Sequence, residues 1–429
     1  MPYTLSAEAL ARSAPPGPLL LAFSGGLDST VLLHLLIDAG LAARLRVVHI
    51  NHQLQSHSDK WAAQCQVVAS ALGLNCRVLT VAVTRGQGVE AGARQARYQA
   101  LFAEAGVDGA TLITAHHQND QAETVLLRLL RGSGVQGLAA MRPLDRRRGV
   151  NVWRPLLDYP RSSLEQYAAE RGLNWQEDPS NQDQSLRRNH LRHSIFPALR
   201  QRWRGLDEVL SRTASHMEEA AVLLDERAEE DAHAGGVDDR YFPLAALETL
   251  NPPRQRNLLR WWLHRQGASA PSAAVLDQML VLQQAAADSQ ARVEWGSWAM
   301  RLYQGRLYLL PRRALAAWQG EVGWAAGSEP PSLPFWQWQP GGGTGVTVRR
   351  PPGDLILRPF TGGERLLRNG MHQRIKELWR AAGVPPWQRR QWPLLYREEA
   401  LVSVPLLGVA DGEAVDDCEV WHLLPRPMP

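Results

Sequence analysis

One turn, between an expected strand and an expected helix, carries the clearest chemistry in this sequence. An apolar run at 19–23 leads into Ser24-Gly25-Gly26-Leu27-Asp28-Ser29-Thr30, and an apolar helix is expected to follow. Adjacent glycines let the backbone approach an anion closely, and the unpaired N–H groups of a helix start favour phosphate. The serine hydroxyls add donors, and Asp28 can hold magnesium against the phosphates. A plain turn in which Asp28 or Ser29 caps the helix is the alternative, and the complete string favours phosphate binding over it.

The turn differs from two common phosphate-binding loops. A Walker loop needs G-x-x-x-x-G-K-[ST], but the only lysines are Lys60 and Lys376, and neither follows such a loop. The G-x-G-x-x-G fingerprint of dinucleotide-binding turns is also absent here.

A second polar cluster follows the strand expected at 110–115. His116, His117, Asp120 and Glu123 fall at the end of that strand and the start of the next helix. One interpretation is that these side chains bind a metal or phosphate. The other is that the acids simply stabilise the positive end of the helix dipole. The expected position of the cluster opposite the glycine turn favours a role in an active site.

Three further segments concentrate arginine. Arg94 and Arg97 lie three residues apart on an expected helix face. A second group near residue 190 and a third between 365 and 387, which includes tryptophan, are suited to the phosphates and bases of RNA. For each segment, taken alone, a solvated basic surface is the competing interpretation.

The alternation of elements predicts the fold class. Short apolar runs alternate with helical patterns from residue 19 to about 140; the runs lie at 19–23, 45–50, 76–83 and 110–115, and the helical patterns at 59–71, 90–104 and 120–131. This alternation predicts an α/β fold with a doubly wound parallel sheet covered by helices. Ligands of such sheets bind beyond the carboxyl ends of the strands, so the loops at 24–28, 51–57 and 116–120 are expected to converge on one cleft.

The chain is long enough for two or three domains. We predict a catalytic domain at 1–217, a mostly helical middle domain at 218–318, a connection at 319–350 and a small α+β C-terminal domain at 351–429. Trp, Gly and Pro are frequent in 319–350, which suits an irregular, extended connection. Its tryptophans are expected to pack against strands instead of stacking on bases.

Composition adds weaker constraints. The net charge is only +4, but arginine supplies nearly all the positive charge, and arginine suits phosphate and base edges. A bias in codon usage explains that preference equally well.

The three cysteines (Cys65, Cys76 and Cys418) are far apart and form no C-x-x-C pair, which argues against a disulfide framework or zinc site. No apolar run approaches the ~18 residues of a membrane helix. These features predict a cytoplasmic protein.

Together the motifs resemble those of the tRNA(Ile)-lysidine synthases, a family of PP-loop ATP pyrophosphatases. The resemblance covers essentially the whole chain, with the motifs in the same order and at similar spacing. They are SGGLDST (24–30), His52-(x)5-Ser58, EAGARQARY (90–98), HHQNDQAET (116–124), RGSG (131–134), RPLL (154–157), EDPSN (177–181), RRNHLR (187–192) and KELWRAAGVPPWQR (376–389).

The resemblance implies a fold like that of the adenine nucleotide α-hydrolases and a ligase activity. ATP would adenylate the wobble cytidine of an isoleucine tRNA with a CAU anticodon and release pyrophosphate. The amine of free L-lysine would then attack C2 and displace AMP, so that the tRNA reads AUA instead of AUG.

The resemblance also assigns roles to individual residues. It implies ATP binding by Ser24, Gly25, Gly26, Leu27, Asp28 and Ser29. It implies Mg²⁺ on Asp28 and Asp120, and catalytic roles for Asp28, Arg94 and Asp120. It implies tRNA contacts by Arg187, Arg188, Asn189, Arg192, Arg365, Arg368 and Lys376.

Three positions depart from the family pattern. Asn119 stands where aspartate is common, Gln55 where arginine is common, and Glu377 where lysine is common. The first departure restricts the expected metal or substrate contact to Asp120, and the third argues against a tRNA contact at position 377.

Three alternatives stay open. A PP-loop tRNA thiolase would need a sulfur-handling cysteine pair or cluster site, which the scattered cysteines disfavour. A tRNA-binding protein without catalysis is disfavoured by the intact loop at 24–30. A small-molecule amide ligase related to NAD synthetase would not require the arginine-rich segments. The sequence leaves open the oligomeric state, a homodimer included, and the group that deprotonates lysine.

Overall fold

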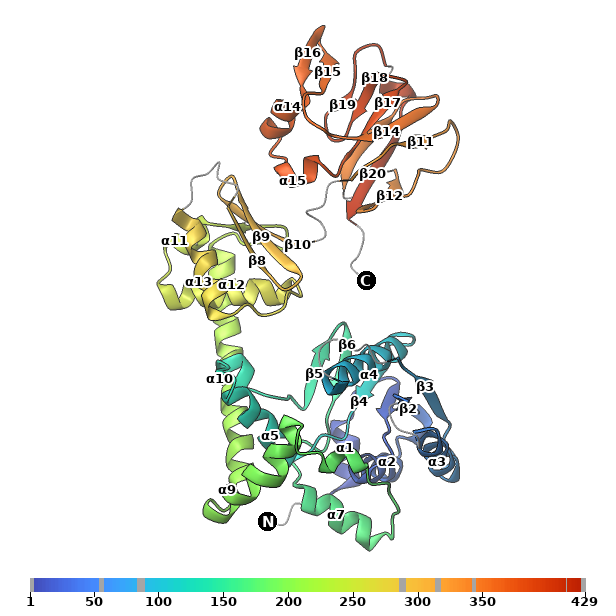
Figure 1. Ribbon diagram of the computed structural model, residues 1–429, viewed down its shortest axis with the longest axis vertical. Coiled ribbons are helices and arrows are strands. Elements are labelled where there is room, and N and C mark those ends of the chain that lie inside the picture. The colour runs from blue at the N-terminus through green and yellow to red at the C-terminus, as the bar shows by residue number, and fades with distance from the viewer. Residues whose placement is uncertain are drawn as a thin grey trace. The chain divides into compact units, whose positions relative to one another are not determined.

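The structure is a computed structural model, and it describes residues 4–53, 58–82, 89–284, 291–312, 318–341, 345–413 and 415–425. The chain divides into two compact units, Met1–Leu223 and Leu224–Pro429. Figure 1 traces the elements of both. No helix within the described ranges is long and apolar enough to cross a membrane.

A six-stranded sheet forms the centre of the first unit. Its strands are β1 (Leu19–Ala22), β2 (Leu45–Asn51), β3 (Cys76–Thr80), β4 (Thr111–Ile113), β5 (Leu144–Arg147) and β6 (Val150–Trp153). The spatial order is β3-β2-β1-β4-β6-β5, and every neighbouring pair is parallel except β5 with β6. The predicted doubly wound parallel sheet is therefore confirmed.

The hairpin of β5 and β6 was not predicted. Arginines dominate 146–148, so the segment lacks the apolar alternation that identifies a strand. Its two-residue turn consists of Arg148 and Gly149, both with positive φ, which matches the right-handed twist of the paired strands.

Helices cover both faces of the sheet. The side chains of Leu19 and Leu21 pack in one apolar cluster, and that of Leu20, between them, packs in another. The first cluster draws on α1 (Ala7–Ser13), α2 (Leu27–Asp38), α3 (Ser58–Ala71) and α7 (Arg161–Glu170); the second draws on α4 (Val89–Gly106). All three leucines are fully buried, because successive side chains of a strand point to opposite faces.

The remaining helices of this unit continue the chain towards the second. They are α5 (Gln118–Leu129), α6 (Val135–Leu138), α8 (Arg187–His190), the π-helical turn η3 (Leu191–Ile195), α9 (Phe196–Arg202) and α10 (Leu206–Ala234). The predicted domain boundary at 217/218 falls inside α10, which runs without interruption (Figure 1). The two units therefore share a helix, and no loop separates them there.

The middle part of the chain combines helices, which were predicted, with a four-stranded antiparallel sheet. The helices are α11 (Ala245–Glu248), α12 (Pro252–Arg265) and α13 (Ala273–Val281). The strands, in spatial order, are β7 (Phe242–Pro243), β10 (Arg306–Pro311), β9 (Trp298–Tyr303) and β8 (Arg292–Trp295).

The C-terminal part is richer in strands than predicted. Five strands pair in the order β11 (Val322–Trp324), β14 (Leu355–Pro359), β17 (Pro393–Arg397), β18 (Ala400–Val404) and β19 (Gly408–Val409). Strand β20 (Glu419–Pro425) lies between β12 (Trp336–Pro340) and β13 (Val346–Arg350). A hairpin of β15 (Arg365–Arg368) and β16 (Met371–Arg374) leads into α14 (Ile375–Ala381), and α15 (Pro386–Arg389) follows.

The prediction that 319–350 is an irregular connection was wrong. This segment supplies β11, β12 and β13, and each pairs with a strand from the C-terminal part. Trp324 and Trp336 are buried in the core that these strands share. This burial confirms the expectation that the tryptophans of the segment pack against strands. Burial of such large apolar side chains stabilises the sheets.

Candidate ATP-binding site

The order of the strands brings two of the predicted loops together. Strand β1 pairs with β2 on one side and with β4 on the other. The order in which the chain adds strands to the sheet therefore reverses at β1, while the strands themselves stay parallel. The loops that leave the carboxyl ends of β1 and β4 therefore emerge next to each other, where sheets of this type bind ligands. The first loop carries Ser24–Gly26 and the second carries His116 and His117.

The third loop expected at this edge, 51–57, is only partly described. Asn51 is buried, and its Nδ2 donates a hydrogen bond to Asp59 Oδ1 at 2.7 Å. Residues 54–57, including Gln55, lie outside the described residues.

The glycine loop is held by hydrogen bonds among its serines. Ser24 Oγ and Ser29 Oγ lie 3.0 Å apart, and Ser29 Oγ donates to Gly26 O at 3.1 Å. The N-cap of α2 is Gly26, and within the described chain no side chain caps this helix start. Neither Asp28 nor Ser29 is therefore an N-cap, which removes the plain-turn alternative. The open helix start offers N–H groups and the positive end of the dipole to an anion.

Gly25 is required at its position for two independent reasons. Its φ of +79° lies in the region that favours glycine, and a Cβ there would come within 2.8 Å of Cys65 Sγ. Its carbonyl accepts a hydrogen bond from Gln176 N at 3.0 Å. Burial raises the pKa of Cys65 to about 12, so the thiol behind the loop is neutral and acts as packing.

Replacement Gly25→Ala is expected to destabilise the chain and to weaken ATP binding. Left-handed strain costs about 1–3 kcal/mol, and the contact with Cys65 adds a steric cost. Gly40→Ala is the matched control, since Gly40 has a φ of +72° and open space around its Cβ position. Thermal unfolding and ATP titration of both variants, and of Gly25→Ala combined with Cys65→Ala, separate the two costs. Equal behaviour of Gly25→Ala and Gly40→Ala would contradict the steric argument.

Asp28 presents an unsatisfied carboxylate beside this loop. Its Oδ2 lies 3.7 Å from His117 Nε2, whereas its Oδ1 is buried without a hydrogen-bond partner among the described residues. Burial raises the pKa of Asp28, the charge of His117 opposes that shift, and Asp120 adds to it. A buried carboxylate oxygen that lacks a partner fits a hard cation such as Mg²⁺.

The number of carboxylates also fits that cation. No group of three or more metal-ligating side chains occurs in the described part of the chain. Magnesium is commonly held by one or two carboxylates together with substrate phosphates and water, so Asp28 beside a phosphate loop meets the requirement.

Two buried acids on α5 form an ion network with two partly exposed arginines, Arg188 on α8 and Arg192 on η3. Arg188 Nη2 lies 3.0 Å and Arg192 Nη2 3.3 Å from Asp120 Oδ1. Arg188 Nε and Arg192 Nε lie 2.6 and 2.7 Å from the two oxygens of Glu123. Glu123 is only 2% exposed. We call these four residues the acid–arginine network.

The network changes the interpretation of Asp120. Burial by itself would raise the pKa of this carboxyl, but His117, Arg188, His116 and Arg192 together lower it well below its usual range. Its Oδ1 accepts from both arginines and its Oδ2 from the backbone N–H of His117. Since both oxygens already have partners, the contacts favour Asp28 over Asp120 as a metal ligand.

The network also changes the interpretation of the arginine cluster at 187–192. Arg188 and Arg192 donate to buried acids, and Asn189 is buried with its Nδ2 donating to Asp183 O at 3.0 Å. Only Arg187 of the four predicted tRNA contacts in this cluster has an exposed side chain. The position of the cluster on a helix was predictable, whereas the buried partners of its arginines were not.

Asn119, which departs from the family pattern, has a structural role. Its Oδ1 accepts a hydrogen bond from the backbone N–H of Arg161 at 2.9 Å, at the first residue of α7. The side chain therefore satisfies one of the open N–H groups of that helix start.

Several cations surround His116. Burial lowers the pKa of His116 to about 3, Asp120 opposes this shift, and Arg154, Arg188 and Arg94 add to it. His116 Nδ1 lies 2.8 Å from Thr114 Oγ1. The influence of Arg94 on this residue supports its predicted place near the cleft, where its guanidinium also lies over the ring of Tyr98.

Arg154 was quoted in a motif but given no role. It is buried, and its Nη1 donates to Arg142 O at 2.7 Å. Arg154 directly follows β6, and the RPLL motif by itself did not indicate that its side chain is buried.

The remaining predicted tRNA contacts belong to the second unit. Arg365 and Arg368 lie on β15 and Lys376 on α14, and all three side chains are exposed.

Comparison with known protein families covers most of the chain. A model described as PP-loop domain matches residues 4–199. Models described as TilS substrate binding domain and TilS substrate C-terminal domain match residues 242–308 and 355–424.

Curated relatives match over nearly their full length. The chain is 40% identical to a tRNA(Ile)-lysidine synthase of Alkalilimnicola ehrlichii, over 95% of this chain and 94% of the relative. It is also 40% identical to one of Pseudomonas putida, over 94% of this chain and 95% of the relative. Among solved structures, the U34-tRNA thiolase NcsA from Methanococcus maripaludis is 16% identical with a TM-score of 0.41, covering 50% of this chain and 78% of that one. With the PP-loop geometry, the domain matches and these identities, the chain belongs to the tRNA(Ile)-lysidine synthase family.

Proposed function

We propose that this chain joins free lysine to C2 of the wobble cytidine in a CAU-anticodon isoleucine tRNA, with cleavage of ATP to AMP and pyrophosphate. The observation that carries the proposal is the open, uncapped start of α2 behind Gly25 and Gly26 at the reversal point of the sheet. The 40% identity to lysidine synthases over almost the entire chain supports the choice of substrates.

The proposed roles follow from the contacts around that loop. Ser24, Ser29 and the N–H groups at the start of α2 bind the pyrophosphate part of ATP. Asp28 holds Mg²⁺, which, when bound, neutralises charge that builds on the phosphates. Arg94, on α4, positions the adenylated base. The acid–arginine network fixes the ionised Asp120 carboxylate, which accepts a hydrogen bond from the backbone N–H of His117 and so positions that residue beside Asp28.

The reaction proceeds in two balanced steps. Cytidine O2 attacks the α-phosphorus and the α–β bond of ATP breaks, which releases pyrophosphate. The deprotonated amine of lysine then forms a bond with C2, and the C2–O bond breaks with departure of AMP. Fixed donors aimed at the phosphates stabilise the charge that develops in the first step.

The thiolase alternative lacks support from the cysteines. Cys65 and Cys76 are 1% and 2% exposed, and burial raises the pKa of each. A thiol that carries sulfur to a substrate must be accessible and readily ionised.

We also propose a cytoplasmic location, where tRNA and free lysine meet. A homodimer stays a prediction, which sedimentation analysis would test.

Incorporation of labelled lysine tests the function. With ATP and magnesium, the chain is expected to attach about one lysine per isoleucine tRNA transcript and to release AMP and pyrophosphate in equal amounts. Methionine tRNA, which has the same CAU anticodon, is the matched control and is expected to be refused. Release of pyrophosphate without lysine attachment, or incorporation of sulfur, would contradict the proposal.

A further inference from the structure

Arg154 carries a buried positive charge at the edge of the sheet where ligands are expected to bind. It directly follows β6, and the backbone N–H of Thr114, just after β4, donates to Trp153 O at 3.0 Å. Arg154 therefore lies next to the loop that carries His116. Its side chain is only 2% exposed, so water has little access to it, and its charge must be balanced by the protein or by a ligand.

The contacts of this guanidinium group leave its charge unbalanced. Nη1 donates to Arg142 O at 2.7 Å, whereas Nε is buried without a hydrogen-bond partner among the described residues. No acid in the described ranges forms an ion pair with Arg154. Asp145, the acid that acts on its charge, pairs with Arg147 at 2.6 Å. A buried charge without a counter-charge is costly, so its presence at this edge of the sheet indicates an anionic ligand.

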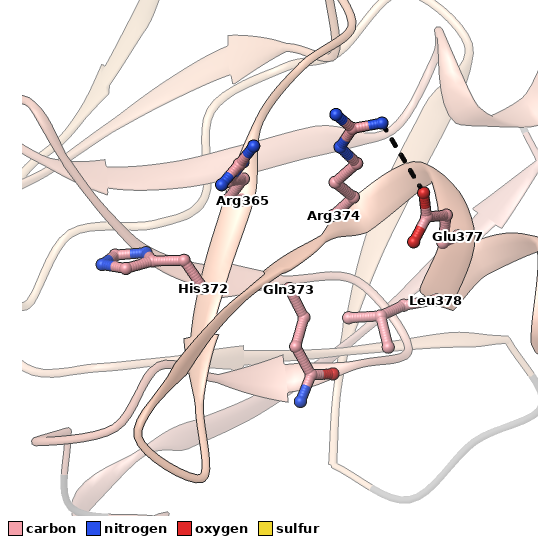
Figure 2. A pocket seen from close by; sticks show the side chains of 6 residues that line it. All are labelled: Arg365, His372, Gln373, Arg374, Glu377 and Leu378. Carbon is pink, nitrogen blue, oxygen red and sulfur yellow. Dashed lines mark ion pairs between the residues drawn. The ribbon is translucent and has the colours of Figure 1, made fainter.

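Other arginines show how such a charge is balanced elsewhere in the chain. Arg188 pairs with Glu123 in the acid–arginine network. Arg350, which is also 2% exposed, donates to three backbone carbonyl oxygens. Arg365, which lines an open pocket on the β15–β16 hairpin in Figure 2, is exposed, so water solvates its charge. Arg154 has none of these arrangements within the described chain.

The surroundings of Arg154 add positive charge. Burial lowers the pKa of Arg154, and Arg147 and Arg94 add to this shift. Arg154 and Arg94 also act together on His116, which their charges help to keep neutral by lowering its pKa to about 3. The side chain of Arg94 is exposed, so this positive region is open to solvent at Arg94 and closed at Arg154.

These features select a small oxyanion as the ligand. A guanidinium group offers paired N–H donors in one plane, which match two oxygens of a carboxylate or of a phosphate. The proposed reaction brings two such groups to the catalytic unit. One is the α-phosphate, which stays on the AMP part after pyrophosphate has left, and the other is the α-carboxylate of free lysine.

We propose that Arg154 is a substrate-binding residue that holds an oxyanion of the reaction, either the α-phosphate of the AMP part or the α-carboxylate of lysine. The bound oxyanion supplies the counter-charge that the chain lacks and accepts a hydrogen bond from Nε. The proposal rests on the proposed function for the identity of the two substrates. It gives a role to the RPLL motif, which the proposed function left without one.

Replacement Arg154→Met tests the assignment with two pairs of ligands. Adenosine is AMP without its phosphate, and lysinamide is lysine with a neutral amide in place of its carboxylate, so each pair isolates one oxyanion. Titration gives Kd for AMP and adenosine, and incorporation into tRNA gives KM for lysine and lysinamide. The wild type is expected to favour the oxyanion-bearing member of one pair by about tenfold to hundredfold, the range for one charge-assisted hydrogen bond. Arg154→Met is expected to lose that advantage, and the pair concerned identifies the ligand.

A purely structural arginine would give a different pattern. Its loss would lower the melting temperature and would impair both members of each pair by the same factor. Methionine keeps much of the apolar stem and removes a charge that nothing in the described chain balances, so the melting temperature of the free variant is expected to stay close to that of the wild type. Arg12→Met, an exposed arginine on α1, is the matched control and is expected to keep both preferences.

Two results would overturn the proposal. One is a folded Arg154→Met variant with unchanged preferences in both pairs, and the other is an equal loss for both members of each pair. If Arg154→Met does not fold, Arg154→Lys replaces it, because lysine keeps the charge but loses the planar fork. An unchanged preference in that variant would overturn the proposal too.

The wild-type chain separates this proposal from the proposed function. Lysine incorporation by the wild type, together with either overturning result, rejects the Arg154 site alone. Absent incorporation by the wild type rejects the proposed function, and the comparison of AMP with adenosine still tests Arg154 because it needs no turnover.

Discussion

Asp28→Asn is expected to lower the rate of lysine incorporation by about 10²-fold or more while the fold stays intact. Loss of one group that stabilises charge in a transition state commonly costs that much. The replacement has nearly the same shape, so it removes the charge without opening a cavity. Incorporation of labelled lysine at saturating ATP and tRNA measures the effect.

The stability of Asp28→Asn is not expected to fall with its activity. Burial disfavours the ionised form of Asp28, as the raised pKa shows, and its Oδ1 has no hydrogen-bond partner among the described residues. Removing this charge should leave the melting temperature unchanged or raise it. An active Asp28→Asn variant would contradict the proposed metal contact, and an inactive variant with a markedly lower melting temperature would point to a structural role instead. Asp59→Asn, on α3, is a control for the chemical change elsewhere in the same unit.

Arg188→Met is expected to destabilise the chain by about 3 kcal/mol. Removing one partner of a buried ion pair leaves an uncompensated charge, which commonly costs 3–5 kcal/mol. Glu123 is 2% exposed and receives hydrogen bonds from both Arg188 and Arg192. For a unit of this size, the expected fall in melting temperature is about 6–12 °C.

Arg187→Met is the matched control, one residue away. The side chain of Arg187 is exposed, so this replacement should change stability by less than about 0.5 kcal/mol while raising the KM for tRNA. Combining Arg188→Met with Glu123→Gln should cost less than the sum of the single changes, because the two residues contact each other. Similar stability of Arg187→Met and Arg188→Met would contradict the network.

The difference in stability between the wild type and Arg188→Met is expected to depend on pH, with a definite sign. The pKa of Asp120 is lowered in the folded chain, so its ion pairs contribute stability above the ordinary value of 3.8 and lose it as the pH falls further. The gap in stability between the wild type and Arg188→Met should therefore be full at neutral pH and shrink in acid. Chemical denaturation at pH 7 and at about pH 2.5, below the ordinary value, measures it.

The arginine cluster illustrates what spacing alone cannot determine. Four residues of one motif were assigned to tRNA, but burial divides them: Arg188, Asn189 and Arg192 bind groups within the chain, and Arg187 faces solvent. Whether an arginine meets a phosphate or a buried carboxylate depends on residues far away in sequence, here Asp120 and Glu123 on α5. The same limit explains the segment 319–350, whose strands pair with partners from another part of the sequence.

The sequence by itself determined the type of nucleotide loop, the alternation of strands and helices, and the family. These are local properties, because glycines, hydroxyls and an aspartate at one turn, and apolar periodicity along each element, act over a few residues. Only the tertiary structure decided that Asp28 keeps an oxygen without a partner in the described part of the chain, while both oxygens of Asp120 have one. That difference arises from burial and from the arginines that the fold brings to α5, since the free energy of a buried charge depends on every group around it.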